Sequence, residues 1–491
     1  MPRVVVVGAG NAALCAALSA RERGAEVLVL ERAPRHLRGG NSAFTAGAMR
    51  VAYGGVHDLR MLMPDLTQDE IDSTDFGSYP TEAFFDDLAR VTDYRTDPEL
   101  AHTLVEQSLP TLLWMSGLGV RFVPIYGRQA FKVEGRFTFW GGLTVEVSGG
   151  GPGLVDSLSR AAERAGVQME YGARAVDLLH GDEGVHGVRV RQDGKTRDEP
   201  ADAVVLASGG FQASPEMRAR YLGPGWDLAK VRGTKYDTGD GILMALRAGA
   251  GSAGNWSGCH AVGWERNAPE FGDPAVGDGF QKHSYPWGVM VNARGQRFVD
   301  EGADFRNYTY AKYGRVILDQ PGQFAWQIFD QKVTHLLRDE YRIRQVTKVT
   351  APTLEQLADQ MDGVDPAGFL AEMRAYNAAV DTSTPFNPNV KDGRATSGLA
   401  VDKTNWANTL EDGPFEAYAV TCGITFTFGG VRIDPHSAQV LDTEMSPIPG
   451  LFAAGELVGG VFYGNYPGGS GLTNGSVFGR IAGTAAAGSS R

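Results

Sequence analysis

The stretch that decides the fold is Arg3-Val4-Val5-Val6-Val7-Gly8-Ala9-Gly10-Asn11-Ala12-Ala13. Its valines predict a strand buried on both faces, as in a parallel sheet, and a helix is expected over residues 14–23. A second strand over residues 26–30 ends at Glu31. Together these form the G-x-G-x-x-A fingerprint, in which backbone approaches a pyrophosphate at the helix N-terminus and the acid accepts from ribose hydroxyls. Residues 3–31 therefore predict a Rossmann-like dinucleotide-binding unit.

The chain as a whole is long and acidic. Its 491 residues suggest about three units, at roughly 150 residues per domain. Apolar residues make up 43% and charged residues 21%, which is typical of a folded globular protein and excludes a disordered one. The formal net charge of −12 argues against nucleic acid as the main partner, because phosphate contacts need a basic surface. A local cluster of cations can still hold an anionic substrate.

Two further patterns bear on location and metals. No apolar run reaches the roughly 18 residues of a membrane span, and no targeting pattern precedes the first strand. The cysteines Cys15, Cys259 and Cys422 are far apart, unlike a disulfide framework, a zinc site or an iron–sulfur cluster. We expect a cytoplasmic protein that does not span a membrane and binds no metal.

Other elements follow from the same patterning. Leucines at helical spacing predict helices over 84–118, and residues 203–206 predict another buried strand that runs into a glycine turn. From about residue 225 the pattern is mixed α+β without a βαβ rhythm. Residues 288–299 predict a hairpin, and the Pro-, Asn-, Thr- and Gly-rich segment 382–415 predicts a loop.

The C-terminal part predicts the second end of a long cofactor. Residues 448–456 read as a strand that delivers Glu456 after a glycine, and Pro467-Gly468-Gly469-Ser470-Gly471-Leu472 begins the last helix. Backbone N–H groups at a helix N-terminus stabilise the negative charge of a reduced flavin ring. With the N-terminal fingerprint, this favours FAD, with 469–472 at the ring and Glu456 accepting from a ribityl hydroxyl. Taken singly, each segment favours a plain turn that caps a strand or a helix.

These stretches and their order give the chain a family resemblance. It resembles the flavoproteins that include fumarate reductases, succinate dehydrogenases and 3-ketosteroid dehydrogenases, and within them most closely the FAD-dependent tricarballylate dehydrogenases. The first likeness rests on residues 4–13, 39–47, 209–211, 238–241, 291–292, 297–301 and 450–479. The closer one rests on residues 8–13, 39–49, 257–262 and 297–314.

The resemblance implies an α/β fold, with a Rossmann-like FAD-binding domain interrupted by an α+β capping domain. The expected boundaries are 1–225 and 381–491 for the two parts of the FAD-binding domain and 226–380 for the capping, substrate-binding domain. No histidine stands at residues 41–42, where covalently flavinylated members carry one, so FAD is expected to be non-covalent. The residues expected to bind it are Gly8, Gly10, Asn11, Ala12, Ala13, Glu31, Arg32, Gly40, Asn41, Ser42, Gly47, Ala173, Ser208, Gly209, Asp240, Glu456, Ser470 and Leu472.

Two positions depart from the fumarate reductases. Phe426 stands near the position of their substrate histidine, and Tyr466 at that of an arginine that anchors a substrate carboxylate. The segment Asn465-Tyr466-Pro467-Gly468 instead resembles that of the ketosteroid dehydrogenases. Plain fumarate or succinate turnover is therefore not the expectation.

The implied chemistry removes hydrogen across a C–C single bond, with a hydride passing to flavin N5 and a proton to a base. The resemblance assigns proton exchange to Arg306, and because a guanidinium is a poor base it needs a relay, for which Asp304 and Glu301 are candidates. His260 is the candidate carboxylate donor and Tyr466 a donor near the flavin. Each has a structural alternative: a domain-interface salt bridge for Arg306, a hydrogen-bonded core or surface position for His260, and packing for Tyr466. Surface positions are expected for a further set: Tyr308, Tyr310, Lys282 and His283.

The leading hypothesis is an FAD dehydrogenase that oxidises a small anionic tricarboxylate, tricarballylate to cis-aconitate, and passes electrons to a separate acceptor protein or quinone. A 3-ketosteroid-type dehydrogenase and a fumarate-reductase-like enoate reductase are the enzyme alternatives. A flavin-binding module without turnover is the alternative from another class.

Overall fold

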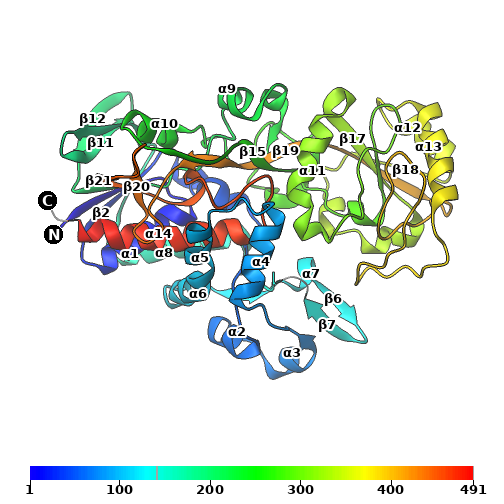
Figure 1. Cartoon of the computed structure of the whole chain (residues 1–491), viewed down its shortest axis with the longest axis horizontal. Coiled ribbons are helices and arrows are strands. Elements are labelled where there is room, and N and C mark those ends of the chain that lie inside the picture. The colour runs from blue at the N-terminus through cyan, green and yellow to red at the C-terminus, as the bar shows by residue number, and fades with distance from the viewer. Residues whose placement is uncertain (140–141, 490–491) are drawn as a thin grey trace. The chain divides into compact units, whose positions relative to one another are not determined.

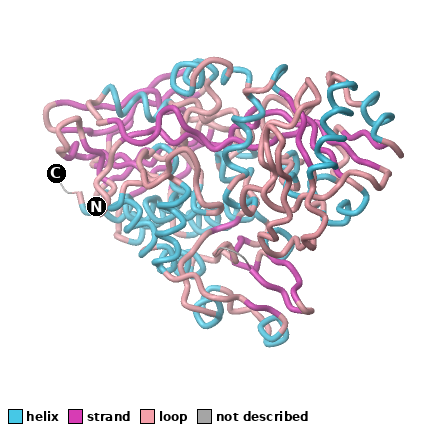
Figure 2. Tube along the Cα trace, turned by 45° about the vertical axis from the view of Figure 1, so that its right-hand side comes forward, coloured by secondary structure: helices cyan, strands magenta, loops and turns pink. Residues whose placement is uncertain are grey.

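The computed structural model of the chain describes residues 1–139 and 142–489, and these form two compact units. Unit 1 contains Met1–Asp227, Gly233–Cys259 and Phe426–Arg491, and unit 2 contains Leu228–Arg232 and His260–Thr425. The chain passes between the units within the strands β15 (Ser252–Glu265) and β19 (Phe415–Val431). Helices and strands both occur in each unit, and Figure 2 distinguishes them by colour along the chain, so the fold is of the predicted mixed α/β class.

The centre of unit 1 is a six-stranded sheet in the order β20-β21-β13-β1-β2-β9. The strands β1 (Arg3–Val7), β2 (Glu26–Glu31), β9 (Gln168–Tyr171), β13 (Ala203–Leu206) and β21 (Pro447–Ala453) are parallel, and β20 (Gln439–Leu441) is antiparallel. Val4, Val5 and Val6 of β1 have no exposed surface. The valine run thus occupies the buried centre that its composition predicts.

Two helices from opposite ends of the sequence pack together in unit 1. They are α1 (Asn11–Glu22) and α14 (Ser470–Gly488), which Figure 1 shows side by side. Gly479 and Gly483 of α14 lie so close to α1 that an added Cβ atom would fall 2.3 Å from the Ala12 carbonyl oxygen and 2.0 Å from that of Ala16. Small residues on both faces permit this approach, which brings the starts of the two helices to one place.

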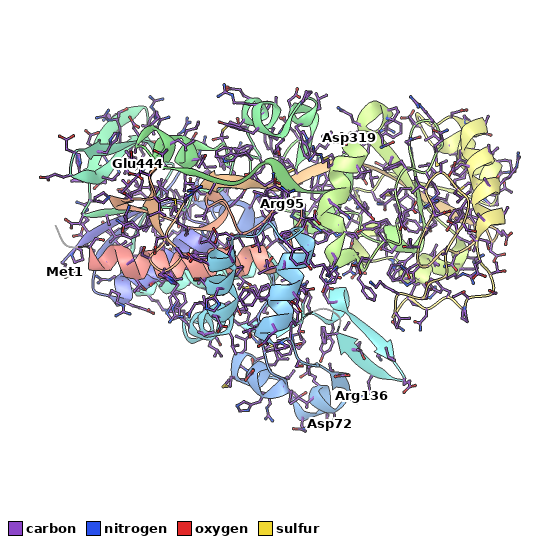
Figure 3. The ribbon with its side chains drawn as sticks, in the orientation of Figure 1. Met1, Asp72, Arg95, Arg136, Asp319 and Glu444 are labelled. Atoms are coloured by element: carbon purple, nitrogen blue, oxygen red, sulfur yellow. The ribbon has the colours of Figure 1, made fainter. Side chains whose placement is uncertain are left out.

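Smaller elements complete unit 1. Among the helices of unit 1 are α4 (Thr81–Val91), α5 (Pro98–Glu106), α6 (Ser108–Gly117), α8 (Gly150–Arg164) and α10 (Asp240–Arg247), of which α5 and α6 pack on α14, α8 packs on α1 and α4 packs on α5. The helices α4, α5 and α6 lie where leucine periodicity predicts helices. The strands β10 (Arg174–Gly181), β11 (Gly184–Gln192) and β12 (Lys195–Pro200) form a separate antiparallel sheet. Side chains labelled in Figure 3, such as Asp72 of α3 (Gln68–Asp72) and Arg136 of β7 (Arg136–Phe139), belong to the peripheral elements.

Unit 2 is built around a mixed sheet in the order β14-β19-β17-β16. Its strands are β14 (Lys230–Val231), β17 (Phe324–Phe329), β16 (Val289–Val291) and the unit 2 part of β19, while β15 and β18 (Lys348–Ala351) also pair with β19. The helices α12 (Leu354–Gln360) and α13 (Pro366–Ala379) cover a core that includes Trp326, Phe369 and Tyr376. The helix α11 (Tyr310–Leu318), which ends beside the labelled Asp319 in Figure 3, packs on β15, because a Cβ at Gly314 would lie 2.3 Å from the carbonyl carbon of Ala261.

Two sequence expectations for this half need comment. The hairpin expected at 288–299 is only partly formed: β16 lies where its first strand was expected but pairs with β17, and the expected second strand keeps a single antiparallel bridge, between Val291 and Arg297. In that segment Arg297 forms a buried ion pair with Glu301. The segment 382–414 contains no helix or strand, as predicted, but it packs on unit 2, where Ala407 and Leu410 join the core. The division into units thus places residues 233–259 and 381–425 differently from the boundaries expected at 226 and 380.

Candidate functional site

The residues expected to bind FAD all lie in unit 1, and we call them together the cradle. The glycine turn between β1 and α1 is one part of it. Gly8 has a φ of 110°, and a Cβ there would lie 2.4 Å from the Ala207 carbonyl oxygen, so only glycine fits. At Gly10 the nearest atoms to an added Cβ are 3.5 Å away, which leaves its backbone open to a neighbour. The turn therefore has the shape that close approach by a phosphate group requires.

Glu31 is fixed at the end of β2 with its carboxylate turned back to this turn. Its side-chain oxygens accept from the Ala9 backbone N–H at 2.9 Å and the Ala33 backbone N–H at 2.7 Å. Burial raises the pKa of Glu31, against the opposing effect of these two backbone donors. Ala173, also buried, donates its N–H to the Glu31 carbonyl at 2.9 Å. A buried carboxylate at this point is suited to accept hydrogen bonds from a sugar.

Asn11 joins the two glycine-rich helix starts. Its side-chain N–H donates to the Leu472 carbonyl at 2.7 Å and to Ser476 Oγ at 3.0 Å, and its backbone N–H donates to Ser42 Oγ at 3.0 Å. The structure therefore brings together three predicted stretches, around residues 8–13, 40–47 and 470–472. The Asn11 side chain itself is engaged in holding them.

The predicted residues at the other side of the cradle are mutually bonded. Arg32 donates to Thr238 Oγ1 at 2.6 Å and to Asp240 Oδ2 at 3.1 Å, and Arg174 also binds Asp240. Asn41 Oδ1 accepts from the Thr234 backbone N–H at 2.9 Å. These contacts fix the surrounding loops. Three predicted glycines in them have positive φ angles: 53° at Gly40, 80° at Gly47 and 75° at Gly209. The predicted Ser208 packs against Gly241, where an added Cβ would lie 2.2 Å from Ser208 Oγ.

A pair of buried carboxyl groups lies in this cradle: Glu456, which the sequence predicted, and Asp237, which it did not. Gln212 Nε2 donates to Asp237 Oδ2 at 2.8 Å and to Glu456 Oε2 at 3.3 Å, and Glu456 also accepts from the Thr427 backbone N–H at 2.9 Å. Burial raises the pKa of Glu456 to about 7. Burial, followed by the nearby Glu456, raises the pKa of Asp237 well above its ordinary value. The only sequence signal for Asp237 is its place just before the Thr238–Gly241 stretch.

The start of α14 carries Ser470, Leu472 and, four residues before Ser470, Tyr466. Ser470 Oγ donates to the Pro467 carbonyl at 2.6 Å, and buried Arg50, which sequence reasoning also missed, donates from Nε to the Gly468 carbonyl at 2.9 Å. Tyr466 is buried against two phenylalanine rings: its ring centroid lies 5.1 Å from that of Phe426 and 5.4 Å from that of Phe462. The two positions that depart from the fumarate reductases thus form an aromatic wall.

The predicted residues of unit 2 gather around Tyr310. The rings of His260 and His283 lie 5.0 and 4.9 Å from its ring, the Arg306 guanidinium carbon lies 6.0 Å from it, and Arg306 Nη1 is 3.5 Å from His283 Nδ1. We call His260, His283 and Arg306 the His–Arg cluster. Burial, and then the charge of Arg232, lowers the pKa of His260, while burial and then Arg306 lowers that of His283. Both rings are therefore neutral near pH 7.

Several expectations for this region are corrected. Lys282, His283 and Tyr310 are buried rather than on the surface, because the segment around 282 lies under Tyr341 and α11. Glu301, a relay candidate for Arg306, is held by Arg297 and by the Met290 backbone N–H at 2.7 Å. Asp304 accepts from the Phe305 backbone N–H at 2.8 Å and lies 3.6 Å from Lys391. Cys259 and Cys422 are buried.

In residues 1–139 and 142–489, no group of three or more His, Cys, Asp or Glu side chains is arranged to hold a metal ion. None of the helices in the same residues combines the length and apolarity needed to cross a bilayer.

Comparison with known proteins gives one family and several relatives. A family model described as an FAD binding domain matches residues 3–472. A probable fumarate reductase of Shewanella frigidimarina (strain NCIMB 400) is 32% identical over 495 residues, covering 99% of this chain and 74% of the relative. The open conformation of a flavocytochrome c3 fumarate reductase is 29% identical with a TM-score of 0.73, covering 99% of this chain and 78% of that one. The 3-ketosteroid-Δ4-(5α)-dehydrogenase of Rhodococcus jostii RHA1, in complex with 4-androstene-3,17-dione, is 25% identical with a TM-score of 0.70, covering 99% and 96%.

Proposed function

This chain belongs to the FAD binding domain family, and we propose that it transfers hydrogen across a carbon–carbon bond of a small polycarboxylate. It is an FAD-dependent oxidoreductase related to fumarate reductases. The proposed reaction is the oxidation of a tricarboxylate, tricarballylate to cis-aconitate. The observation that carries the anionic substrate is the His–Arg cluster, where two buried imidazoles and a guanidinium converge on Tyr310.

The cradle of unit 1 fits FAD. The turn at 8–13 is held against the Ala207 backbone, where only glycine fits at position 8, and we assign the pyrophosphate to this turn and the adenosine ribose to Glu31. Glu456 is assigned to a ribityl hydroxyl, and the start of α14 at 470–472 to the flavin ring. Bound there non-covalently, FAD supplies a two-electron acceptor of hydride.

The substrate-binding roles fall to unit 2. Arg306 can bind a carboxylate at two points, as a planar guanidinium does, and we assign His260 a second carboxylate oxygen. Formation of the double bond also requires a proton to leave the carbon beside a carboxylate, and we assign that transfer to Arg306. Because Glu301 is bound to Arg297, Asp304 is the remaining carboxylate candidate for the relay. Electrons then leave through a separate acceptor protein or quinone.

A second candidate is favoured by the aromatic wall in unit 1. Tyr466, Phe426 and Phe462, with Phe428 beside them, present an apolar surface with one hydroxyl, which suits a carbonyl on a hydrophobic ring. A 3-ketosteroid-type dehydrogenation would use Tyr466 as a donor to that carbonyl. The opposite direction, reduction of an enoate, uses the same residues with the flavin reduced first.

Anaerobic flavin absorbance separates these functions. Tricarballylate is expected to bleach the flavin of the purified holoprotein, and succinate to do so more slowly. Bleaching by 4-androstene-3,17-dione alone would replace the proposal with the second candidate. Reoxidation of the dithionite-reduced protein by cis-aconitate tests the reverse direction. If no carboxylate and no steroid changes the flavin redox state, the chain is a binding module and the proposal is wrong.

Arg306→Lys tests the assigned catalytic residue. Lysine keeps the charge but loses the planar fork, so we expect the bleaching rate to fall by about 100-fold or more with FAD content unchanged. Arg315→Lys, an exposed position on α11, is the matched control and should bleach at the wild-type rate. Undiminished activity in Arg306→Lys would remove Arg306 from the mechanism.

A further inference from the structure

The backbone that carries His283 is anchored on both sides. Lys282 Nζ donates to the Glu340 carbonyl at 2.9 Å and to three carbonyls of its own segment, 279–281. The Ser284 backbone N–H donates to Tyr341 Oη at 2.8 Å. Lys403 Nζ donates to the Pro286 and Gly288 carbonyls at 2.8 and 2.6 Å. Two fully buried lysines thus serve to fix this segment, and the imidazole between them has a defined position.

The contacts of the ring determine where its proton lies. His283 Nδ1 faces Arg306 Nη1 at 3.5 Å. A guanidinium has only donors, so Nδ1 must be the acceptor in this pair. The ring is neutral, because burial and the charges of Arg306, Arg232 and Arg338 lower its pKa well below the ordinary value. A neutral imidazole carries one N–H, which is therefore on Nε2.

That N–H is left over. His283 is 2% exposed, and among residues 1–139 and 142–489 its Nε2 has no hydrogen-bond partner. Buried donors in folded proteins are nearly always paired, and an exception indicates a missing acceptor. The charged groups that act most on the ring are arginines, so the acceptor that this environment favours carries negative charge. A carboxylate oxygen meets both requirements.

We propose that His283 determines substrate specificity: its Nε2–H donates to a carboxylate of the bound substrate. This rests on the proposed function, since it names the ligand of that same site. In addition to binding a substrate carboxylate, Arg306 then holds the His283 ring in the tautomer that donates from Nε2. The imidazole cannot accept from a hydroxyl at Nε2 in that tautomer, which favours a carboxylate over an alcohol at the same position.

Two substitutions place an amide at different ends of the ring. The side-chain amide of His283→Gln reaches about as far as Nε2 and can replace the donor, whereas that of His283→Asn reaches only as far as Nδ1. The concentration dependence of anaerobic flavin bleaching by tricarballylate gives an apparent Kd and a limiting rate. We expect His283→Asn to raise the apparent Kd by about 10- to 100-fold, as loss of a hydrogen bond to a charged group does. His283→Gln should stay within about threefold of wild type.

A ligand that lacks one carboxylate completes the test. If His283 binds the carboxylate that glutarate lacks, His283→Asn should weaken tricarballylate strongly and glutarate little, so the preference between them collapses. FAD content and melting temperature establish that each variant is folded. The wild-type protein with 15N-labelled histidine gives a reading free of substitutions: one Nε2–H signal should move downfield when tricarballylate is added.

The outcomes distinguish this inference from the function beneath it. If wild type is bleached by tricarballylate and His283→Asn leaves the apparent Kd of each ligand at its wild-type value, the role of His283 is wrong and the proposed function stands. If the labelled protein shows no Nε2–H signal that responds to tricarballylate, the same conclusion follows even when His283→Asn fails to fold. If wild type neither binds nor oxidises any carboxylate, both proposals fail together.

Discussion

The most informative single residue in the cradle is Glu456, whose burial has opposite effects on the protein with and without FAD. In the apoprotein its pKa is raised to about 7, against about 4.3 for an exposed glutamate. Between these values the folded state binds more protons than the unfolded state, so the free energy of unfolding decreases as pH rises through 7. Above pH 7 the folded apoprotein carries an ionised carboxylate beside Asp237, which is costly.

Glu456→Gln is therefore expected to stabilise the apoprotein at pH 8 by about 1–3 kcal/mol. The advantage should shrink toward pH 5, where Glu456 of the wild type is protonated. FAD affinity at pH 8 should move the other way and fall about tenfold, because the charged acceptor for a ribityl hydroxyl is lost. Thermal unfolding across pH 5–8 and fluorescence titration with FAD measure the two effects. Glu444→Gln, an exposed position labelled in Figure 3, should change neither. Equal FAD affinity in both variants would contradict the assignment of Glu456.

At the scale of elements, the joint between α1 and α14 decides whether the cradle forms. An alanine at Gly483 would place a Cβ 2.0 Å from the Ala16 carbonyl oxygen, in backbone that cannot move without separating the helices. We expect Gly483→Ala to lower the free energy of unfolding by about 2–3 kcal/mol or more and to reduce FAD content after purification. Gly488→Ala, at the end of the same helix with nothing within 4 Å of the added Cβ, provides the control and should not destabilise. If the two variants melt together, the helices are not closely packed in solution.

The elements also show what sequence could foresee. The strands β1 and β2 and the helix α1 lie where their local pattern predicts them, because a valine run, a glycine turn and a helical stretch are readable within 30 residues. The second strand of the hairpin expected at 288–299 does not form, and β16 pairs with β17, about 35 residues further on. The local sequence carries no signal for that long-range pairing. His283 was expected at the surface for a related reason. Its burial comes from Tyr341, Lys403 and α11, all distant in sequence.

For the whole molecule, the residues assigned to FAD and the residues assigned to the substrate belong to different units. The residues assigned to FAD come from 8–47, 173–209, Asp240 and 456–472, which all belong to unit 1 although they span most of the sequence. Arg306, His260 and His283 belong to unit 2. Sequence motifs found the first set because glycine turns carry strong local signals. They found Arg306 and His260 only by resemblance. They did not single out Asp237, and they placed His283 at the surface, because burial of a polar group leaves no mark on the sequence.

This division predicts where FAD stabilises the protein. A ligand stabilises the structure that binds it by a free energy that grows with the logarithm of its concentration over its Kd, and regions outside the binding unit gain only through cooperativity. Removing FAD should therefore speed amide hydrogen exchange in β1, α1, β21 and α14 of unit 1, by about tenfold or more. The core strands β16 and β17 and the helix α13 of unit 2 should exchange at nearly the same rate.

Hydrogen–deuterium exchange of the holoprotein and apoprotein under identical buffer gives the comparison. Tricarballylate added to the holoprotein supplies the complementary arm, because the proposed carboxylate ligands lie around Tyr310 at the start of α11. It should slow exchange in α11 and in the segment around 283 without further change in α1. Loss of FAD that speeds exchange equally in α13 and in α1 would contradict this, because it would mean that the two units unfold as one and that the cradle is not confined to unit 1.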